Sequence, residues 1–314
     1  MEMHNLSNSV VTEFTFVGFP QLHNYYILFF IMFLFVYLIL IIGNSLILVA
    51  AITNRKLHTP MYFFLCNLAI TDIFFTTTTI PKMLALFVVD SKIIYFHFCF
   101  VQLCFLHSLG SGEAFLLVVM AYDRYVAICN PMHYRNIMTN KVNILLAAVT
   151  WILPFIIIIP VTVLAAQLPF CGPNEIHHCF CEHVYVIKLA CTDITAHVYL
   201  GFSCAMIVSF LPLFLVIFSY IKILIAVFQI GSTEERIKAL STCSSHIMVV
   251  LIYYVSSIVA YVTYQTDNIS DDFHVIGTIC FTILTPTLNP LIYTLRNREV
   301  KETVIKLINN IYML

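Results

Sequence analysis

The sequence predicts an all-α membrane protein: a bundle of seven transmembrane helices with a short amphipathic eighth helix on the cytosolic side. Three observations favour this class. Hydrophobic residues make up 61% of the 314 residues and charged residues only 10%, whereas soluble domains carry roughly 25% charged residues. Seven stretches are long and apolar enough to cross a bilayer, which takes about 20 residues per helix. The basic residues are also distributed unevenly between the segments that join these stretches.

The seven predicted spans form one receptor-sized domain over residues 25–295. They cover approximately residues 25–52, 60–88, 97–128, 141–165, 196–228, 240–264 and 273–295. Residues 1–24 are predicted to be an extracellular tail. They are not expected to be a cleavable signal peptide, because charge and polarity interrupt any apolar core there. In residues 296–314, apolar residues recur at helical spacing with charges between them. This pattern predicts a cytosolic amphipathic helix that lies on the inner leaflet.

The distribution of charge predicts the orientation of the chain. With the N-terminus outside, all but three of the 15 basic residues fall in cytosolic segments, the exceptions being Lys82, Lys92 and Lys188. Cytosolic loops of membrane proteins are enriched in Lys and Arg, so we expect an outer N-terminus and an inner C-terminus. Two glycosylation sequons, at Asn5 and Asn268, then face outward. Asn5 is the favoured site because it lies in the tail, whereas Asn268 lies in a short loop near the membrane.

Polar motifs recur inside the spans in a fixed order. They are "GNSLIL" in the first span, "LAITD" in the second, "MAYDRYVAIC" after the third, Trp151 in the fourth, "SY" at 219–220 and "NPLIY" at 289–293. This set resembles the rhodopsin-like G-protein-coupled receptors. The stretches "LHTPMYFFLCNLAITD", "MAYDRYVAICNPMHY", "KALSTCSSH" and "PTLNPLIYTLRN" are similar to those of the vertebrate odorant (olfactory) receptors. The resemblance runs from about residue 24 to residue 301.

Membership of that family would imply a specific function. Its receptors bind small organic odorants in an outward-facing transmembrane cavity. They then activate a heterotrimeric G protein of the olfactory stimulatory type, which raises cyclic AMP. The resemblance therefore implies a multi-pass plasma-membrane protein of olfactory cilia, and membrane lipid would surround its helices. Its partners would be an odorant and a G protein, and no basic stripe suggests binding to nucleic acid.

An aspartate–arginine pair lies where the third span is expected to reach the cytosol. An arginine at this depth can extend to the interface and pair locally, so an anchor for the helix end is one interpretation of Arg124. The resemblance implies instead a switch, in which Arg124 is held near Asp123 at rest and is released toward Tyr220 and Tyr293 on activation. The family pattern assigns G-protein coupling and activation to Asp123, Arg124, Tyr125, Tyr220, Asn289, Pro290 and Tyr293.

Two carboxylic acids, Asp72 and Glu113, are predicted to lie inside the membrane, with Asn44 and Asn289 as neighbours. An ionised acid in hydrocarbon is costly, so such groups face the bundle and find a proton, hydrogen bonds or a cation. The resemblance implies a sodium-type pocket of Asn44, Asp72 and Glu113. A protonated, hydrogen-bonded pair is the alternative. Apart from this sodium ion, we expect no cofactor.

Cysteines in polar loops are the candidates for disulfides. Cys171, Cys181 and Cys191 follow one another ten residues apart in the second outer loop, and Cys99 begins the third span on the same face. Cys179 is left over, so the sequence alone leaves the connectivity open. The resemblance implies the pairs Cys99–Cys181 and Cys171–Cys191, which would form in the oxidising lumen and exterior.

The same loop contains the run "HHCFCEH", which includes side chains that bind zinc or copper. His178, Cys181 and Glu182 are therefore a weak candidate for a metal site. A disulfide at Cys181 would remove one of these ligands, and the favoured interpretation is a disulfide with solvated histidines.

Candidate ligand-binding residues are expected to lie on four spans and to face one cavity. They are His107, Gly110, Ser111, Ala205, Val208, Tyr254, Ser257, Tyr261 and Thr282. Those on the third span fall at i, i+3 and i+4 and so share one face of a helix. Those on the sixth span fall at i, i+3 and i+7. The positions on the fifth and seventh spans are implied by the resemblance, and the small residues among all of these could instead serve close helix packing.

The sequence constrains the ligand weakly. Leu106 stands where amine receptors carry an aspartate, and the outer halves of the third, fifth, sixth and seventh spans contain no Arg or Lys. These features favour a neutral or modestly polar compound, although His107 or Lys188 could still meet an acid. Enzymatic function is not expected, since no nucleophile–base pair or phosphate loop is present. The alternative function is a transporter or ion channel that uses Asp72 and Glu113.

Overall fold

The computed structural model describes residues 11–265 and 271–312, most of which are helical. The helices are α1 (Tyr26–Thr53), α2 (Pro60–Thr77), α3 (Ile80–Val89), α4 (Phe96–Cys129), α5 (Tyr134–Ile137), α6 (Asn140–Ala166), α7 (His183–Ile187), α8 (Thr195–Gln229), α9 (Thr233–Gln265), α10 (Asp271–Arg296) and α11 (Arg298–Tyr312). Short 3-10 helices cover Pro20–Tyr25, Arg55–Leu57 and Pro131–His133. Within the described ranges, seven segments are long and apolar enough to cross a membrane, which confirms the predicted fold class.

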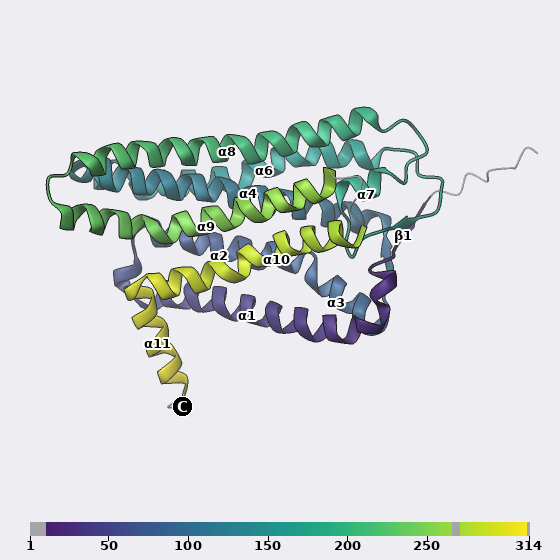
Figure 1. The fold of residues 1–314 in the computed structure, drawn as a ribbon, viewed down its shortest axis with the longest axis horizontal. Coiled ribbons are helices and arrows are strands. Elements are labelled where there is room, and N and C mark those ends of the chain that lie inside the picture. The colour runs from purple at the N-terminus through teal and green to yellow at the C-terminus, as the bar shows by residue number, and fades with distance from the viewer. Residues whose placement is uncertain (1–10, 266–270, 313–314) are drawn as a thin grey trace, which may run out of the picture.

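The long helices lie side by side and α11 leaves the bundle at one end (Figure 1). α4 packs against α2, α6, α8 and α9, so it forms the centre of the bundle. Small residues allow this close approach, as at Gly112, where a Cβ atom would lie 3.4 Å from the backbone oxygen of Thr150 on α6. Because α4 runs the whole length of the bundle, side chains near its two ends belong to one continuous element.

The second span is interrupted, which the sequence analysis did not predict. α2 ends at Thr77 and α3 begins at Ile80. Pro81 lacks a backbone N–H, so it cannot continue the hydrogen-bond ladder of a preceding helix. The amide Nε2 of Gln102 donates to the backbone oxygen of Thr78 at 2.7 Å, which satisfies a carbonyl group at the break.

α9 begins at Thr233, earlier than the predicted start near residue 240. Its first turn contains Glu234 and Glu235, and negative side chains stabilise the positive N-terminal end of a helix dipole. The predicted start marked only the edge of the apolar composition. The helix therefore extends beyond the part that lipid would cover.

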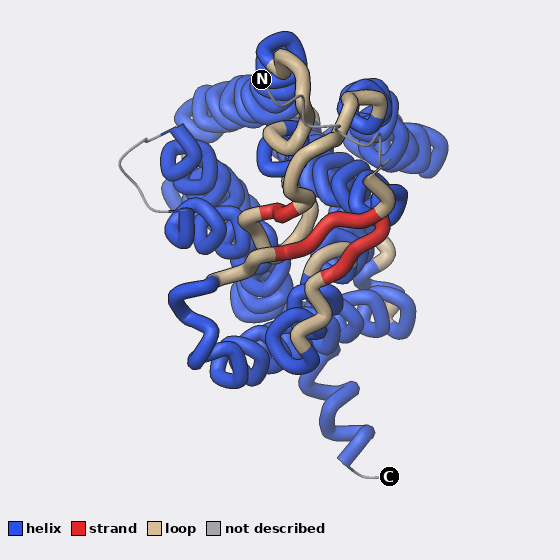
Figure 2. The backbone as a smooth tube through the Cα atoms, turned by 90° about the vertical axis from the view of Figure 1, so that its right-hand side faces the viewer, coloured by secondary structure: helices blue, strands red, loops and turns tan. Residues whose placement is uncertain are grey.

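A small sheet of β1 (Glu13–Phe16), β2 (Ile93–Tyr95) and β3 (Glu175–Ile176) lies across one end of the bundle (Figure 2), here named the sheet end. β1 is the central strand, antiparallel to β2 and parallel to β3. Phe14 and Phe16 are fully buried. The predicted tail thus contains a strand that the sequence analysis did not anticipate, because four residues give too short an alternation to recognise.

α11 corresponds to the predicted eighth helix, and its apolar face docks on the bundle. Val300 and Val304 are buried, whereas Ile305 is exposed. The amide Nδ2 of Asn54, at the end of α1, donates to Thr303 Oγ1 at 2.7 Å. α11 therefore marks the end of the bundle opposite the sheet end (Figure 1).

The contact between α1 and α10 depends on a glycine. A Cβ atom at Gly43 would lie 3.0 Å from Cγ of Pro290, which is tighter than an ordinary van der Waals contact. We expect Gly43→Val to push the two helices apart and to lower stability by about 1–3 kcal/mol, the usual cost of overpacking. Thermal unfolding of the purified receptor would measure the effect, with the exposed Val49→Ala on the same helix as control. Equal melting temperatures for Gly43→Val and the wild type would contradict this packing.

Candidate functional site

A cavity of about 220 Å³ lies between α4, α6, α8, α9 and α10, and the loop helix α7 borders it. Most of the predicted ligand-binding residues line it, namely His107, Gly110, Ser111, Ala205, Val208, Ser257 and Thr282. Its lining is mainly apolar, and Phe75 and Phe281 contribute large aromatic surfaces. Cavities that bind small molecules have this composition, with a few polar groups in an apolar lining.

The prediction that Tyr254 of α9 lines the cavity is wrong by one residue. Tyr253 lines the cavity and its hydroxyl donates to the backbone oxygen of Gly110 at 2.9 Å. Tyr254 does not line the cavity: it is buried beside Tyr253, with the ring centroids 5.0 Å apart. Tyr253, Ser257 and Ala260 fall at i, i+4 and i+7, so the face of α9 is turned from the predicted one. Tyr261 lies on α9, but its side chain is outside the described part of the chain.

Both disulfides that the resemblance implied are present, Cys99–Cys181 and Cys171–Cys191. The first joins the start of α4 to the loop before α7. Gln102 reinforces this junction, since its Oε1 accepts from the backbone N–H of Cys181 at 2.9 Å. Glu182 caps α7 by accepting from the backbone N–H of Val184 at 3.0 Å. These contacts place His183 at the cavity, a position that the sequence analysis did not assign to the site.

The weak metal candidate in this loop does not assemble. Cys181 is oxidised in a disulfide, and Glu182 serves as the cap of α7. His178 is buried, its Nδ1 accepts from the backbone N–H of Phe180 at 3.3 Å, and burial lowers its pKa to about 3. Among the described residues, no group of three or more His, Cys, Asp or Glu side chains is placed to hold a metal ion. Asn5 and Asn268, the two sequons, lie outside the described residues.

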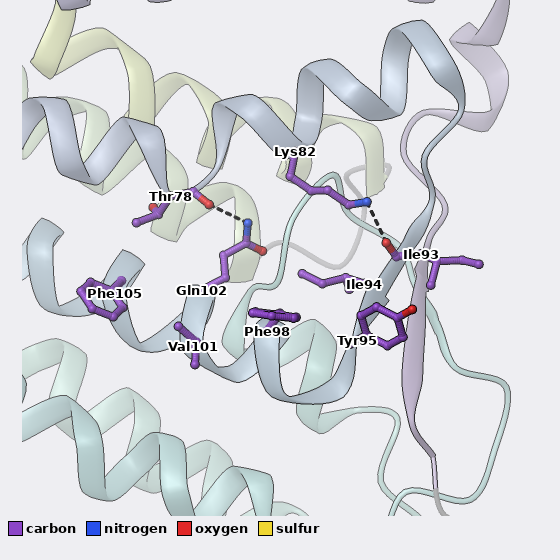
Figure 3. A pocket seen from close by; sticks show the side chains of 9 residues that line it. All are labelled: Thr78, Lys82, Ile93, Ile94, Tyr95, Phe98, Val101, Gln102 and Phe105. Atoms are coloured by element: carbon purple, nitrogen blue, oxygen red, sulfur yellow. Dashed lines mark hydrogen bonds between the residues drawn. The ribbon is translucent and has the colours of Figure 1, made fainter.

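A second hollow, of about 420 Å³, lies on the outer side of α3, α4 and β2 (Figure 3). Four of the residues around it are more than half exposed: Ile93 at 52%, Tyr95 at 62%, Phe98 at 65% and Val101 at 52%. Lys82 borders it, and its Nζ donates to the backbone oxygen of Ile93 at 2.7 Å. This hollow is an open groove on the surface of the bundle, whereas the smaller cavity lies inside it.

The two intramembrane acids meet through one amide. Nδ2 of Asn289 donates to Asp72 Oδ2 at 2.9 Å and to Glu113 Oε1 at 3.2 Å, and both acids are buried. Asn44 lies nearby on α1, but its Nδ2 donates to the backbone oxygens of Leu40 and Pro286, each at 3.1 Å. The carbonyl of Pro286 needs this donor because the residue four positions on, Pro290, has no N–H.

Several oxygens in this cluster have no hydrogen-bond partner. They are Oδ1 of Asn44, Asp72 and Asn289, each of them buried. Unsatisfied buried oxygens are costly, and two carboxylates that share one amide cannot both carry an uncompensated charge. The arrangement therefore fits either a proton on the acid pair or a small cation among these oxygens.

Arg124 is held by Asp123 at the end of α4. Its Nη2 lies 2.5 Å from Asp123 Oδ2, and its side chain is only 11% exposed. The hydroxyl of Tyr134 donates to Asp123 Oδ1 at 2.6 Å. Burial raises the pKa of Tyr134, and the nearby Asp123 carboxylate raises it further. Arg124 therefore faces the bundle interior and not the lipid.

Three of the other predicted switch residues, Tyr125, Tyr220 and Tyr293, lie near this ion pair. Asn289 and Pro290 do not: Asn289 bonds the two buried acids, and Pro290 packs against Gly43. Arg124 lies within electrostatic reach of Tyr220 and Tyr293. The hydroxyl of Tyr220 is hydrogen-bonded to Nδ1 of His246 at 2.7 Å, and Tyr125 packs against the same cluster. The hydroxyl of Tyr293 is buried with no hydrogen-bond partner. The hydroxyl of Tyr220 is thus already hydrogen-bonded, whereas the hydroxyl of Tyr293 can form a new hydrogen bond.

Comparison with known proteins agrees with this geometry. The family model described as "Olfactory receptor" matches residues 33–310. The human protein "Olfactory receptor 2AT4" is 48% identical over 297 residues, which cover 94% of this chain and 92% of that protein. The human "Olfactory receptor 13D1" is 42% identical, covering 98% and 88% of the two chains, and the mouse "Olfactory receptor 5AR1" is 40% identical, covering 98% of each. The chain therefore belongs to the olfactory receptor family.

Proposed function

We propose that this olfactory receptor binds a small odorant in the 220 Å³ cavity and activates a heterotrimeric G protein of the olfactory stimulatory type, which raises cyclic AMP. One observation carries the proposal. α4 lines the cavity with His107, Gly110 and Ser111 and carries the Asp123–Arg124 pair in the same continuous helix. A ligand that shifts α4 or its neighbours can therefore bias the packing around Arg124.

The family and the seven spans make the chain a multi-pass plasma-membrane receptor and not an enzyme. We propose that the sheet end faces outward and that the protein reaches olfactory cilia. Both disulfides lie toward the sheet end, and disulfides persist on the oxidising side of a membrane. Arg55, Lys56 and Arg135 belong to segments that the distribution of basic residues assigns to the cytosol.

The cavity limits the size of the odorant. A cavity of about 150 Å³ in another protein binds benzene, so about 220 Å³ admits a compact compound somewhat larger than benzene. Glu182 is the only Asp, Glu, Lys or Arg among the described residues of the lining. A neutral organic ligand fits this lining best.

Filling the cavity should block the response. Ala205 lines the cavity from α8, and a phenylalanine there would occupy space that the odorant needs. We expect Ala205→Phe to raise the half-maximal odorant concentration for cyclic AMP by roughly 5–150-fold, because overpacking costs about 1–3 kcal/mol. The control is Ile207→Phe, at an exposed position of the same helix. Equal odorant responses in these two variants at matched surface expression would contradict the proposed binding site.

We also propose that Asp72, Glu113 and Asn44, with Asn289, hold a sodium ion that stabilises the resting receptor. The unpartnered oxygens at this cluster support the proposal, since small cations prefer oxygen ligands. Replacing external sodium with choline should then raise basal cyclic AMP in the wild type but not in Asp72→Asn. A basal cyclic AMP level that does not change with external sodium would favour a protonated Asp72–Glu113 pair instead. A transporter or channel would show ion flux that Asp72→Asn abolishes.

A further inference from the structure

Two histidines face the odorant cavity from different elements. His107 lies on α4 and His183 on the loop helix α7, and both line the cavity. Their ring centroids are 6.4 Å apart and the ring planes are nearly perpendicular, at 85°. Nε2 of each ring is buried and makes no hydrogen bond of good geometry, although the backbone of His197 lies close to His183. Buried polar atoms are normally hydrogen-bonded, so two such atoms at one cavity indicate a missing partner.

A glycine on α8 makes room for the second imidazole. A Cβ atom at Gly201 would lie 2.8 Å from Nε2 and 3.0 Å from Cδ2 of His183. The bare backbone of α8 thus lets the ring of His183 pack where any larger residue would displace it. The position of this imidazole is therefore built into the fold.

Several hydroxyls of the lining are already engaged, although Thr162 Oγ1 is buried with no hydrogen-bond partner. The hydroxyls of Ser111, Tyr253, Thr278 and Thr282 each donate to a backbone oxygen, at 2.7, 2.9, 3.1 and 2.8 Å. Glu182 accepts from the backbone N–H of Val184 at the start of α7. The two imidazoles lie close together and are therefore the pair of polar groups placed to hold one atom of a guest between them.

Both imidazoles are neutral in this environment. Burial lowers the pKa of His183 to about 4, and a charge on His107 beside it would be costly in a mainly apolar cavity. A neutral imidazole offers one N–H donor and one acceptor nitrogen. Two of them together can satisfy a group that both donates and accepts.

We propose that the odorant is an alcohol or a phenol whose hydroxyl group bridges His107 and His183, donating to one ring and accepting from the other. This inference rests on the proposed odorant-binding function of the cavity. Two hydrogen bonds of about 2.8 Å at the tetrahedral angle of a hydroxyl oxygen join nitrogens roughly 4.6 Å apart, which a centroid separation of 6.4 Å permits.

Other classes of ligand fit less well. Ethers, aldehydes, ketones and esters can only accept, so they satisfy both rings only when both Nε2 atoms carry a proton. A carboxylate finds no Lys or Arg in the described lining and meets Glu182. An ammonium group can only donate, and its best partner, Glu182, is already bound to the backbone. A hydroxyl on a compact apolar skeleton also satisfies both rings when only one of the two Nε2 atoms carries a proton, because it can donate to one ring and accept from the other.

The direct test uses sets of compounds that share a skeleton. One set is 2-phenylethanol, its methyl ether, phenylacetaldehyde, phenylacetic acid, 2-phenylethylamine and ethylbenzene, and a second set has cyclohexyl in place of phenyl. The receptor is expressed in full length at the cell surface and cyclic AMP is measured. Loss of one or two net hydrogen bonds predicts that each alcohol acts at a concentration about ten-fold below every other member of its set.

Substitutions of the two histidines then test whether these residues cause the preference for the alcohol. His107→Phe and His183→Phe keep an aromatic ring but remove its nitrogens, and each should reduce the alcohol-to-ether preference to about two-fold or less. Gly201→Ala should do the same by displacing the His183 ring. His97→Phe and His177→Phe, at exposed histidines, should keep the preference. A purely structural role of the two rings would weaken alcohol and ether equally.

The outcomes separate this inference from the proposed function. A hydrocarbon, ether, aldehyde, acid or amine that acts as strongly as its alcohol would overturn the hydroxyl bridge and leave odorant binding standing. Silence toward both sets at normal surface expression would count against the cavity as an odorant site and against the bridge with it. If the histidine variants do not reach the surface, the order of potencies in the wild type still decides.

Discussion

Arg124→Ala is expected to abolish the odorant-driven rise in cyclic AMP while leaving odorant binding in place. The Arg124 side chain is 11% exposed and pairs with Asp123 at 2.5 Å, on the same helix that lines the cavity. Coupling between two sites is typically about 1–3 kcal/mol, or roughly 5–150-fold in an equilibrium. Removing the guanidinium removes the group that pairs with Asp123 and lies near Tyr220 and Tyr293.

The matched control is Arg135→Ala, because Arg135 is exposed in the segment that follows α4. Its cyclic AMP response should stay close to that of the wild type. Asp123→Asn should act in the opposite direction to Arg124→Ala and raise basal cyclic AMP, since it frees Arg124 without ligand. A full odorant response from Arg124→Ala would leave only the interpretation of a helix-end anchor.

Cys181→Ser should sharply lower the amount of receptor at the cell surface. The bond to Cys99 closes a sequence separation of 82 residues and holds the loop before α7 over the cavity. Loss of a native disulfide typically costs about 2–5 kcal/mol. The loss would also free Glu182 and His183 from their positions at the cavity, so the receptor that does reach the surface should respond to odorant only at a much higher concentration.

Cys280→Ser is the control for this change, because Cys280 is an exposed free cysteine. Cys99→Ser should match Cys181→Ser, and the double variant should be no worse than either single one, since all three remove the same bond. Additive losses in the double variant would show that the two residues act separately and would contradict a shared disulfide in the mature receptor.

The fold was predictable from the sequence because the bilayer imposes a length on each helix. Seven apolar stretches correspond to seven membrane-capable segments, and both disulfides implied by the family resemblance are present. The strand β1 was not predictable, since it consists of four residues whose partners, β2 and β3, are far away in sequence. The break between α2 and α3 had one signal in the sequence, Pro81. The hydrogen bond from Gln102 to the backbone oxygen of Thr78 at this break is visible only in three dimensions.

The site was predicted less completely than the fold. Helical spacing placed His107 and Ser257 at the cavity, but α9 presents Tyr253 to the cavity in place of the predicted Tyr254. Asn44 was expected beside the acids, yet its amide bonds the carbonyl of Pro286. His183 was missed because its run of histidines and cysteines resembles a metal site. Only the disulfide geometry shows that the loop folds down onto the cavity.

The most direct test of coupling between the cavity and Arg124 measures two affinities: that of the odorant with and without G protein, and that of the G protein with and without odorant. If the two sites share one conformational equilibrium, a nucleotide-free G protein must tighten odorant binding by the same factor by which odorant tightens G-protein binding. We expect this factor to exceed about five in the wild type and to fall to one in Arg124→Ala. An odorant affinity that does not change when the G protein binds the wild-type receptor would contradict the coupling.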